Sequence, residues 1–319
     1  MLKDKFLILG ANGKLGTQLT KSLRQIHGQE QVIATDVHLP IDGSYYLPFE
    51  KLDATDGSKM AYLVERYRIT HIYHLAAILS TKGEINPLNM WDVNMRCFFN
   101  VLEAARSFKI KKVFFPSSIA VFGSNTPRLN TPQDTIRTPE TVYGMSKVAA
   151  ENWCSYYFNK YGVDVRSVRF PSIVHKTEST GSTGDFAVEM IKNAVNGSIN
   201  ECFIGADTRM PLMYVDDAVR ASLEIMDTPA SKISIRSSYN LSAFSATPAE
   251  LFEEIKKYYP QFKIIYKPDF REKIACSWPE TIDDTAAHND WKWQSHFNLE
   301  ETVNAMIVYL RENLEKIGI

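Results

Sequence analysis

Phe6-Leu-Ile-Leu-Gly-Ala-Asn-Gly-Lys-Leu-Gly16 decides the fold, because four apolar residues run directly into three glycines spaced three apart. Residues 17–26 continue with helical periodicity, so the stretch predicts a strand, a glycine turn and a helix. Gly10 allows a tight turn, Gly13 lets a phosphate approach the backbone, and Gly16 lets helix and strand pack closely. The pattern predicts a nucleotide-binding site at the start of an α/β sheet.

An acidic residue follows the second predicted strand. The apolar run of residues 31–35 ends at Asp36, twenty residues past Gly16. An acid at this place accepts hydrogen bonds from the adenosine ribose hydroxyls and repels a 2'-phosphate. The spacing therefore predicts NAD, rather than NADP, as the cofactor.

Strand and helix patterns alternate along the first half of the chain. The predicted elements after Asp36 are a loop at 39–50, helices at 56–67 and 87–108, and strands at 70–77, 111–116 and 162–170. This alternation predicts a doubly wound parallel sheet with five strands, in a Rossmann domain of residues 1–171. We expect residues 172–319 to form mainly a smaller, interleaved substrate domain, with some segments returning to the first. In this part the patterns predict a Ser/Thr/Gly loop at 177–185, strands at 213–215 and 238–241, a loop at 275–279, and helices at 216–226, 247–259 and 298–315.

Tyr143 and Lys147 lie four residues apart, which places them on one face of a helix. The spacing by itself is also typical of an ordinary amphipathic helix. An ammonium group beside a phenol favours the phenolate, so a tyrosine in this setting can exchange protons near neutral pH. Ser117 and Ser118 follow the predicted strand 111–116, at the sheet edge where open α/β sheets bind ligands, although a serine pair there also suits a turn. Together these residues predict a proton-transfer site.

The composition favours a small-molecule ligand. With 36 Lys and Arg against 37 Asp and Glu among 319 residues, the net charge of -1 gives no general attraction to nucleic acid or to an anionic membrane. No apolar run of about 18 residues occurs, and the first strand begins too early for a signal peptide. We expect a soluble protein, cytoplasmic or, if a presequence was removed, in the mitochondrial matrix. The cysteines are far apart, which argues against a disulfide framework and a zinc cluster, and no metal is expected: they are Cys97, Cys154, Cys202 and Cys276.

The glycine pattern, Asp36, Ser118 and Tyr-x-x-x-Lys occur in the order found in extended short-chain dehydrogenase/reductases, which the chain resembles over nearly its full length. Within that group it is most similar to the short-chain type of L-threonine 3-dehydrogenases. The stretches that carry this likeness are Pro116-Ser-Ser-Ile-Ala-Val-Phe-Gly123, Glu140-Thr-Val-Tyr-Gly144, residues 160–169, Pro211-Leu-Met-Tyr214 and Ser277-Trp-Pro-Glu-Thr-Ile-Asp-Asp284.

This resemblance implies NAD-dependent oxidation of the β-hydroxyl of L-threonine to 2-amino-3-ketobutyrate. Tyr143 would be the catalytic base, Lys147 would hold the nicotinamide ribose and lower the tyrosine pKa, and Ser118 would bind the reacting hydroxyl. The family's assembly implies a homodimer formed through the helices at about 87–108 and 143–160.

The same resemblance assigns the ligand-binding residues. The NAD site would consist of Gly10, Asn12, Gly13, Leu15, Gly16, Asp36, Asp53, Ala54, Leu75, Ala76, Ala77, Asn94, Tyr143, Lys147 and Pro171. By periodicity alone, Asn94 is the odd polar residue of its helix and suits a surface position. The substrate would be surrounded by Ser80, Ser117, Ser118, Tyr143, Thr183, Gly184 and Trp278.

The chain departs from the threonine dehydrogenase pattern in two places. Phe170-Pro-Ser172 stands where the family has Tyr-Pro-Gly, and Gly181-Ser-Thr-Gly-Asp185 stands for Gly-Gly-Gly-(Thr/Ala)-Thr-Asp. The family's second threonine, which helps to hold the substrate carboxylate, falls on Gly184. Either threonine binds more weakly, or Thr183 replaces the lost hydroxyl through a shifted loop. We expect these departures to affect the affinity for the substrate rather than the type of reaction.

Two other functions use the same scaffold. A nucleotide-sugar epimerase or dehydratase would use the same tyrosine, lysine and serine, but the Ser277-Trp-Pro279 stretch argues against it. A non-catalytic NAD-binding redox sensor would need no proton-transfer group, and the intact Tyr143 and Lys147 argue against that. A zinc-dependent threonine dehydrogenase is excluded for want of clustered Cys and His ligands.

Overall fold

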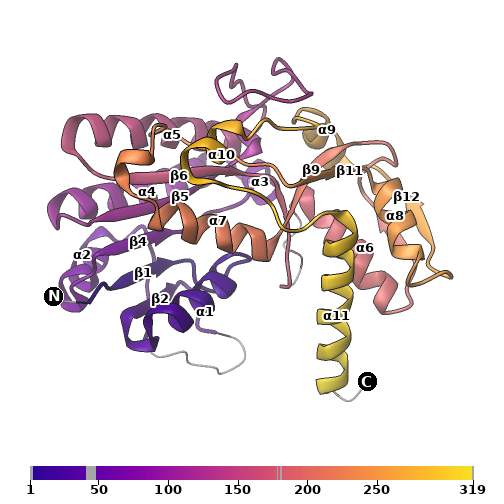
Figure 1. The fold of residues 1–319 in the computed structure, drawn as a ribbon, viewed down its shortest axis with the longest axis horizontal. Coiled ribbons are helices and arrows are strands. Elements are labelled where there is room, and N and C mark those ends of the chain that lie inside the picture. The colour runs from indigo at the N-terminus through magenta and orange to yellow at the C-terminus, as the bar shows by residue number, and fades with distance from the viewer. Residues whose placement is uncertain (1–2, 41–47, 178, 180–181, 318–319) are drawn as a thin grey trace.

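The computed structural model describes residues 3–40, 48–177, 179 and 182–317 (Figure 1). The strands are β1 Phe6–Leu9, β2 Val32–Asp36, β3 Phe49–Lys51, β4 His71–His74, β5 Lys112–Ser118, β6 Val165–Phe170, β7 Ser172–Val174, β8 Asn200–Cys202, β9 Met210–Tyr214, β10 Tyr239–Asn240, β11 Phe244–Ala246 and β12 Ile264–Tyr266. The α-helices are α1 Gly16–His27, α2 Gly57–Tyr67, α3 Ser80–Ile85, α4 Pro87–Ser107, α5 Val142–Tyr161, α6 Phe186–Val195, α7 Val215–Asp227, α8 Pro248–Lys256, α9 Phe270–Cys276, α10 Thr285–Trp291 and α11 Leu299–Ile317.

A seven-stranded sheet, counted over the described residues, forms the centre of the protein in the order β10-β6-β5-β4-β1-β2-β3. Every neighbouring pair in it is parallel. The chain goes from β1 to β2 on one side and returns to β4 on the other, so the strand order reverses between β1 and β4. In such sheets the ligand lies at the carboxyl ends of the strands beside this reversal. The predicted doubly wound parallel fold is confirmed.

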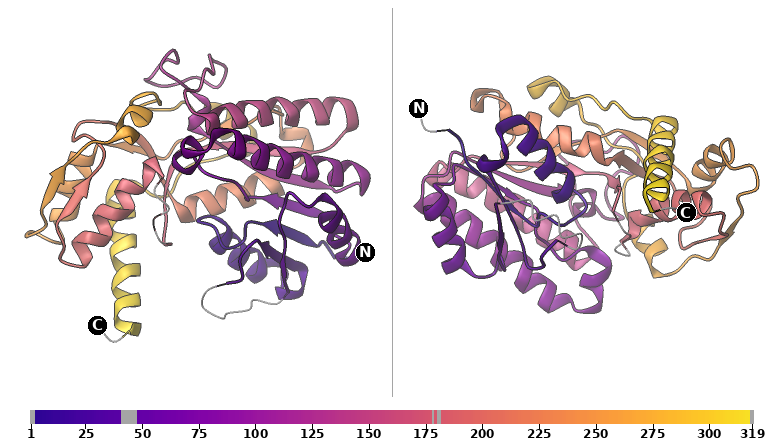
Figure 2. Two further views of the ribbon diagram at one scale, coloured as in Figure 1. Left: turned by 180° about the vertical axis from the view of Figure 1, so that it is seen from behind. Right: turned by 90° about the horizontal axis from the view of Figure 1, so that it is seen from below.

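Helices cover both faces of this sheet (Figures 1 and 2). Because successive strand side chains point to opposite faces, Phe6 and Ile8 of β1 pack into a core with α1 and α7, whereas Leu7 and Leu9 pack with α2, α4 and α5. All four β1 side chains are buried, which explains the uninterrupted apolar run in the sequence.

Several elements differ from the sequence prediction. The region expected to be a loop at 39–50 contains β3, whereas residues 41–47 lie outside the described part. The predicted strand at 238–241 is present as β10, and it extends the large sheet by pairing with β6. Helix α3 was not predicted, and α9 extends to Cys276 through part of the expected loop at 275–279. The three residues of β3 are too few for hydrophobic periodicity to reveal this strand.

The remaining strands form two small sheets, β11-β9-β7 and β12-β8. Strand β7 begins two residues after β6 ends, so the chain passes directly from the large sheet to the small one. In Figure 1 this smaller part, with α6, α8 and α11, lies at the right of the central sheet. It supplies one wall of the site described below.

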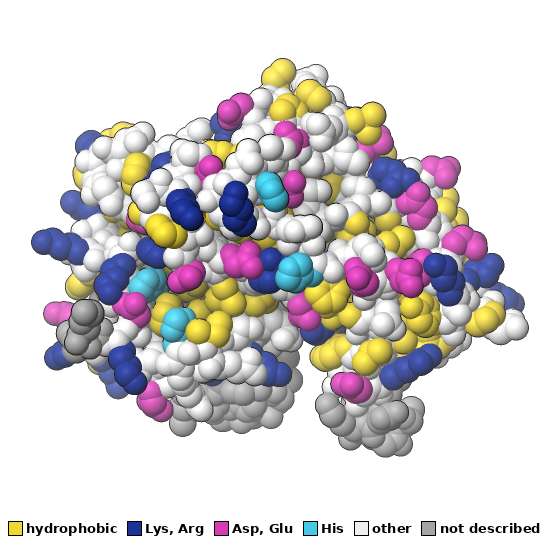
Figure 3. All heavy atoms as spheres, viewed as in Figure 1, with side chains coloured by type: hydrophobic (Ala, Val, Ile, Leu, Met, Phe, Trp, Pro, Cys, Tyr) yellow, Lys and Arg dark blue, Asp and Glu magenta, His cyan; other side chains and the backbone are white. Residues whose placement is uncertain are grey.

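Charged side chains of both signs are interspersed over the face seen in Figure 3. Among the described residues, no helix combines the length and the apolar character needed to cross a bilayer.

Candidate active site

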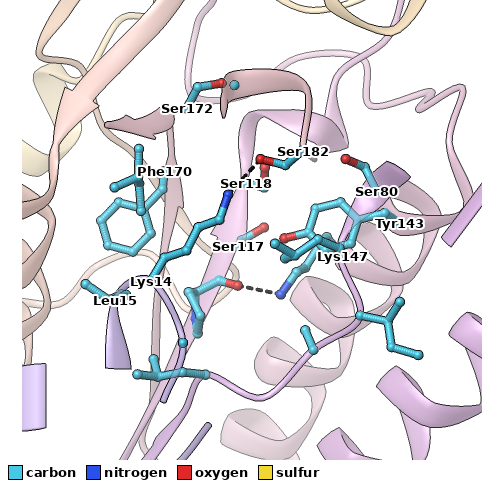
Figure 4. Close-up of a pocket in the computed structure, with 18 of the residues that line it drawn as sticks. Lys14, Leu15, Ser80, Ser117, Ser118, Tyr143, Lys147, Phe170, Ser172 and Ser182 are labelled. Carbon is cyan, nitrogen blue, oxygen red and sulfur yellow. Dashed lines mark hydrogen bonds between the residues drawn. The ribbon is translucent and has the colours of Figure 1, made fainter. Parts of the chain in front are cut away.

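A pocket of about 430 Å³ lies between the central sheet and the smaller part (Figure 4). Its walls come from the glycine loop after β1, the segment after β4, the end of β5, the first turns of α5, the connection from β6 to β7, and Ser182 and Gly184. The predicted site residues that line it are Gly10, Gly13, Leu15, Gly16, Leu75, Ala77, Ser80, Ser117, Ser118, Tyr143, Lys147, Pro171, Gly184 and Trp278.

A second hollow, of about 250 Å³, continues from the first along the edge of the sheet. The two share Gly10, Gly13, Leu75, Ala77 and Ile78. Asp36, Asp53, Ala54 and Ala76 line the second hollow alone. The pair therefore makes one elongated site across the strand reversal, the shape that a dinucleotide needs.

The glycine loop fits a closely held pyrophosphate. Gly10 has a φ of 85°, and a Cβ there would lie 2.8 Å from the backbone nitrogen of Ala76. A Cβ on Gly16 would lie 2.1 Å from the carbonyl oxygen of Gly10. At Gly13 the nearest atom would be 3.3 Å away, so the protein itself leaves more room beside this glycine. Side chains at the first two positions would break the turn, whereas one at Gly13 would occupy space beside the loop.

The carboxylate of Asp36 is hydrogen-bonded to the glycine loop. One carboxylate oxygen accepts a 3.1 Å hydrogen bond from the backbone N–H of Asn12, and the other accepts one of 3.1 Å from His38. The Asn12 side chain donates to the His38 carbonyl at 2.7 Å. Asn12 thus ties the loop to the end of β2, and Asp36 remains in the wall of the second hollow.

Asn94 is buried, with 8% of its surface exposed, so the surface position suggested by periodicity is wrong. Its side-chain oxygen accepts from the N–H of Ile78 at 2.8 Å, and its amide donates to the Ile78 carbonyl at 3.0 Å. Since Ile78 lines both hollows, Asn94 fixes the pocket wall from behind.

The helix that carries Tyr143 and Lys147 begins at Thr141, whose hydroxyl accepts from the N–H of Gly144 at 3.1 Å. Tyr143 lies in the first turn and Lys147 one turn later. The Lys147 ammonium donates a 2.7 Å hydrogen bond to the carbonyl of Pro116, and its nitrogen lies 5.4 Å from the centre of the Tyr143 ring. The two residues share one helix face, as predicted.

The pKa shifts of these two residues come mainly from burial. Burial raises the pKa of Tyr143, and a hydrogen bond with Ser118 opposes this by lowering it. Burial lowers the pKa of Lys147 to about 7, although Cys154 and Glu151 act to raise it. The lysine is hydrogen-bonded to the Pro116 carbonyl rather than to the phenol.

Ser117 and Ser118 have different partners, because neighbouring strand residues point to opposite sides. The Ser118 hydroxyl accepts from the N–H of Ala120 at 3.2 Å and acts to lower the pKa of Tyr143. Ser117 is 3% exposed and donates a 2.6 Å hydrogen bond to the buried carboxylate of Glu151. Glu151 in turn pairs with Arg169 at 2.9 Å. The Ser117 hydroxyl is thus hydrogen-bonded to Glu151, whereas the Ser118 hydroxyl acts on Tyr143.

The residues predicted to surround the substrate are only partly brought together. Ser80, in the first turn of α3, and Trp278, in the turn after α9, are buried and line the pocket. Gly184 lines it too, but Thr183 does not. The Thr183 side chain is fully buried, and its hydroxyl has no hydrogen-bond partner among the described residues. Thr183 lies behind the wall instead of taking the place of the family's second threonine.

Three residues missed in the sequence join the glycine loop to the opposite wall. Lys14 donates to the hydroxyl of Ser182 at 2.8 Å and forms an ion pair with Asp185. Burial alone would raise the pKa of Asp185, but a hydrogen bond from His175 and the charge of Lys14 hold it well below its usual range. A basic residue inside a glycine loop was the available signal, but its partner lies about 170 positions away in the sequence.

Comparisons with known proteins agree with this geometry. The family model described as "NAD dependent epimerase/dehydratase family" matches residues 6–242. An uncharacterized epimerase/dehydratase of Staphylococcus saprophyticus is 43% identical over 307 residues, covering 95% of this chain and 96% of the relative. A GalE-like L-threonine dehydrogenase from Cupriavidus necator, solved in its holo form, superimposes with a TM-score of 0.93 at 46% identity, covering 96% of this chain and 99% of that one.

A monomeric L-threonine 3-dehydrogenase from a metagenome, solved in its apo form, superimposes with a TM-score of 0.94 at 41% identity, covering 97% of this chain and 99% of that one. The long match to the family model and the extent of these likenesses show that the chain belongs to the NAD-dependent epimerase/dehydratase family, whose cofactor is NAD.

Proposed function

We propose that the protein is an L-threonine 3-dehydrogenase, which oxidises the β-hydroxyl of L-threonine to the ketone of 2-amino-3-ketobutyrate with NAD. The observation that carries the proposal is the meeting of Tyr143, Ser118 and Lys147 in one pocket at the end of the dinucleotide groove. The likeness to solved threonine dehydrogenases at 46% and 41% identity supports this substrate.

In the proposed reaction, Tyr143 takes the proton of the substrate hydroxyl while Ser118 donates a hydrogen bond to the same oxygen. Lys147 is proposed to hold the nicotinamide ribose. Bound NAD would supply the acceptor for the hydride of the β-carbon, and its positive charge would favour the phenolate of Tyr143 over the phenol. Trp278 is buried in the pocket wall and is proposed to help keep water from the reacting atoms.

The remaining assignments are part of the same proposal. The NAD-binding residues other than Asn12 and Asn94 border the two hollows. Asn12 and Asn94 support the walls through their hydrogen bonds to His38 and Ile78. Ser80 and Trp278 are proposed to contact the amino acid.

A steady-state assay with NAD and four substrates tests the proposal: L-threonine, L-allo-threonine, L-serine and UDP-galactose. We expect NADH formation with L-threonine at the highest kcat/KM and no conversion of UDP-galactose. Epimerisation of the nucleotide sugar without oxidation of L-threonine would instead establish the epimerase alternative. Tight NAD binding with no turnover of any of the four would favour a redox sensor.

We further propose that two copies pair through α4 and α5. These helices leave large apolar side chains on the surface, among them Leu88, Trp91, Met145, Trp153 and Tyr156. Such exposure on adjoining helices is typical of a covered face. Light scattering should give twice the chain mass of 36.3 kDa at micromolar concentration, and a single-chain mass would contradict this assembly.

A further inference from the structure

Ser172 and Gly184, one residue from each of the two departures from the threonine dehydrogenase pattern, lie in contact. A Cβ placed on Gly184 would lie 2.6 Å from the Cβ of Ser172 and 2.8 Å from its hydroxyl oxygen. Carbon atoms do not approach so closely without bonding, so residue 184 cannot carry a side chain while residue 172 is serine. The two departures are therefore a coupled exchange.

Neither residue is free to move away. Ser172 begins β7, where it is paired with Leu212 of β9. Gly184 stands between Thr183 and Asp185, both fully buried. Asp185 is fixed by Lys14 and by His175, whose ring nitrogen lies 3.1 Å from the carboxylate. The backbone of Gly184 is not in the left-handed region, so the Ser172 side chain is the principal obstacle to a larger residue there.

The Ser172 hydroxyl is available to a ligand. Ser172 lines the pocket, and its side chain makes no hydrogen bond with any described residue. Figure 4 places it across the pocket from Lys147, on the same side as Ser182. A substrate whose hydroxyl is bound by Ser118 and Tyr143 would direct its other end toward this wall.

We propose that Ser172 is a specificity-determining residue whose hydroxyl binds the carboxylate end of the 2-amino-3-hydroxy acid, taking the role of the hydroxyl absent at Gly184. The inference rests on the proposed function for its substrate class. The steric coupling of residues 172 and 184 does not depend on any substrate. Ser172 acts on binding, so its loss changes KM more than kcat.

Four variants test the exchange: Ser172→Ala, Ser172→Gly, Gly184→Thr and the double variant Ser172→Gly/Gly184→Thr. Each is assayed with NAD and L-threonine, and with L-threoninol, in which an alcohol replaces the carboxylate. Removing a hydrogen bond to a charged group should raise the KM of Ser172→Ala for L-threonine about tenfold, with a smaller change in kcat. The KM for L-threoninol should be the same in this variant and the wild type.

Thermal unfolding measures the coupling without substrate. Gly184→Thr should lower Tm by about 3 °C or more, because its Cβ overlaps Ser172. In the double variant Tm should return to within about 1 °C of Ser172→Gly, and the KM for L-threonine should approach the wild-type value. An unchanged KM in Ser172→Ala, or a double variant as unstable as Gly184→Thr, would overturn the proposal. A wild type inactive on L-threonine would refute the proposed function, and the Tm series would still decide the coupling.

Discussion

The ammonium of Lys147 lies 5.4 Å from the centre of the Tyr143 ring, yet its hydrogen bond goes to the carbonyl of Pro116, 2.7 Å away. Pro116, in strand β5 just before Ser117 and Ser118, thus holds the lysine in place. The arrangement orients Lys147 in the pocket while burial makes its charged form costly.

Stability should therefore depend on pH through Lys147. Burial lowers its pKa to about 7, from 10.5 in the unfolded chain. Between these values the unfolded chain binds a proton that the folded protein has released, so this lysine makes the free energy of unfolding rise with pH, by up to about 1.4 kcal/mol per unit. Urea unfolding at pH 7 to 10 should show a shallower rise in Lys147→Met. The control Lys160→Met, at an exposed position of the same helix, should parallel the wild type.

Asp36 should determine the choice between NAD and NADP. The carboxylate lies in the wall of the second hollow and braces Asn12 in the glycine loop. Asp36→Ala should weaken NAD binding about tenfold or more and reduce the preference for NAD over NADP, because it removes a ribose partner and the charge that repels a 2'-phosphate. Titration of both nucleotides measures this. Asp56→Asn, at the N-cap of α2, is the matched control and should preserve the preference.

Two glycines should give separable effects. Gly16→Ala places a Cβ 2.1 Å from the Gly10 carbonyl oxygen and should destabilise the fold by about 1–3 kcal/mol. Gly13→Ala meets its nearest protein atom at 3.3 Å, so it should cost less stability but should weaken NAD binding. Urea unfolding and NAD titration of both variants test this, and equal losses of stability would contradict it.

Substitutions of Ser117 and Ser118 should also affect different properties, stability for Ser117 and catalysis for Ser118. Ser118→Ala should lower kcat about 10- to 100-fold, since its hydroxyl shares the pocket with Tyr143 and is proposed to bind the reacting oxygen. Ser117→Ala removes the 2.6 Å hydrogen bond to buried Glu151 and should cost about 1–3 kcal/mol of stability with a smaller loss of kcat. Kinetics and unfolding measured on both variants decide this. A greater loss of kcat in Ser117→Ala would show that Ser117 serves the reaction directly.

Structural features that depend only on neighbouring residues in the sequence were predictable. Short segments of sequence were enough to predict strand β1, the glycine turn after it and the helix that carries Tyr143. The position of Asp36 at the end of the second strand was predictable in the same way. Their periods and turn residues determine their conformations almost independently of the rest of the chain. The doubly wound order then followed from their alternation.

Features that depend on distant partners were not predictable. Asn94 was assigned to the surface because no sequence pattern indicates that its side chain is hydrogen-bonded to the backbone of Ile78. Lys14 and Ser182 are 168 positions apart. Ser172 and Gly184 depart from the family pattern at separate places in the sequence, but they lie in contact in the structure. Only the packing of β7 against residues 183–185 reveals this contact.

The central claim is that Tyr143 accepts the proton when L-threonine is oxidised, and the most direct measurement compares NADH formation by the wild type and Tyr143→Phe. We predict that the wild type oxidises L-threonine and that the variant, still folded and still binding NAD, loses about 10³-fold in kcat. A variant that turns over L-threonine at a rate near that of the wild type would contradict the account.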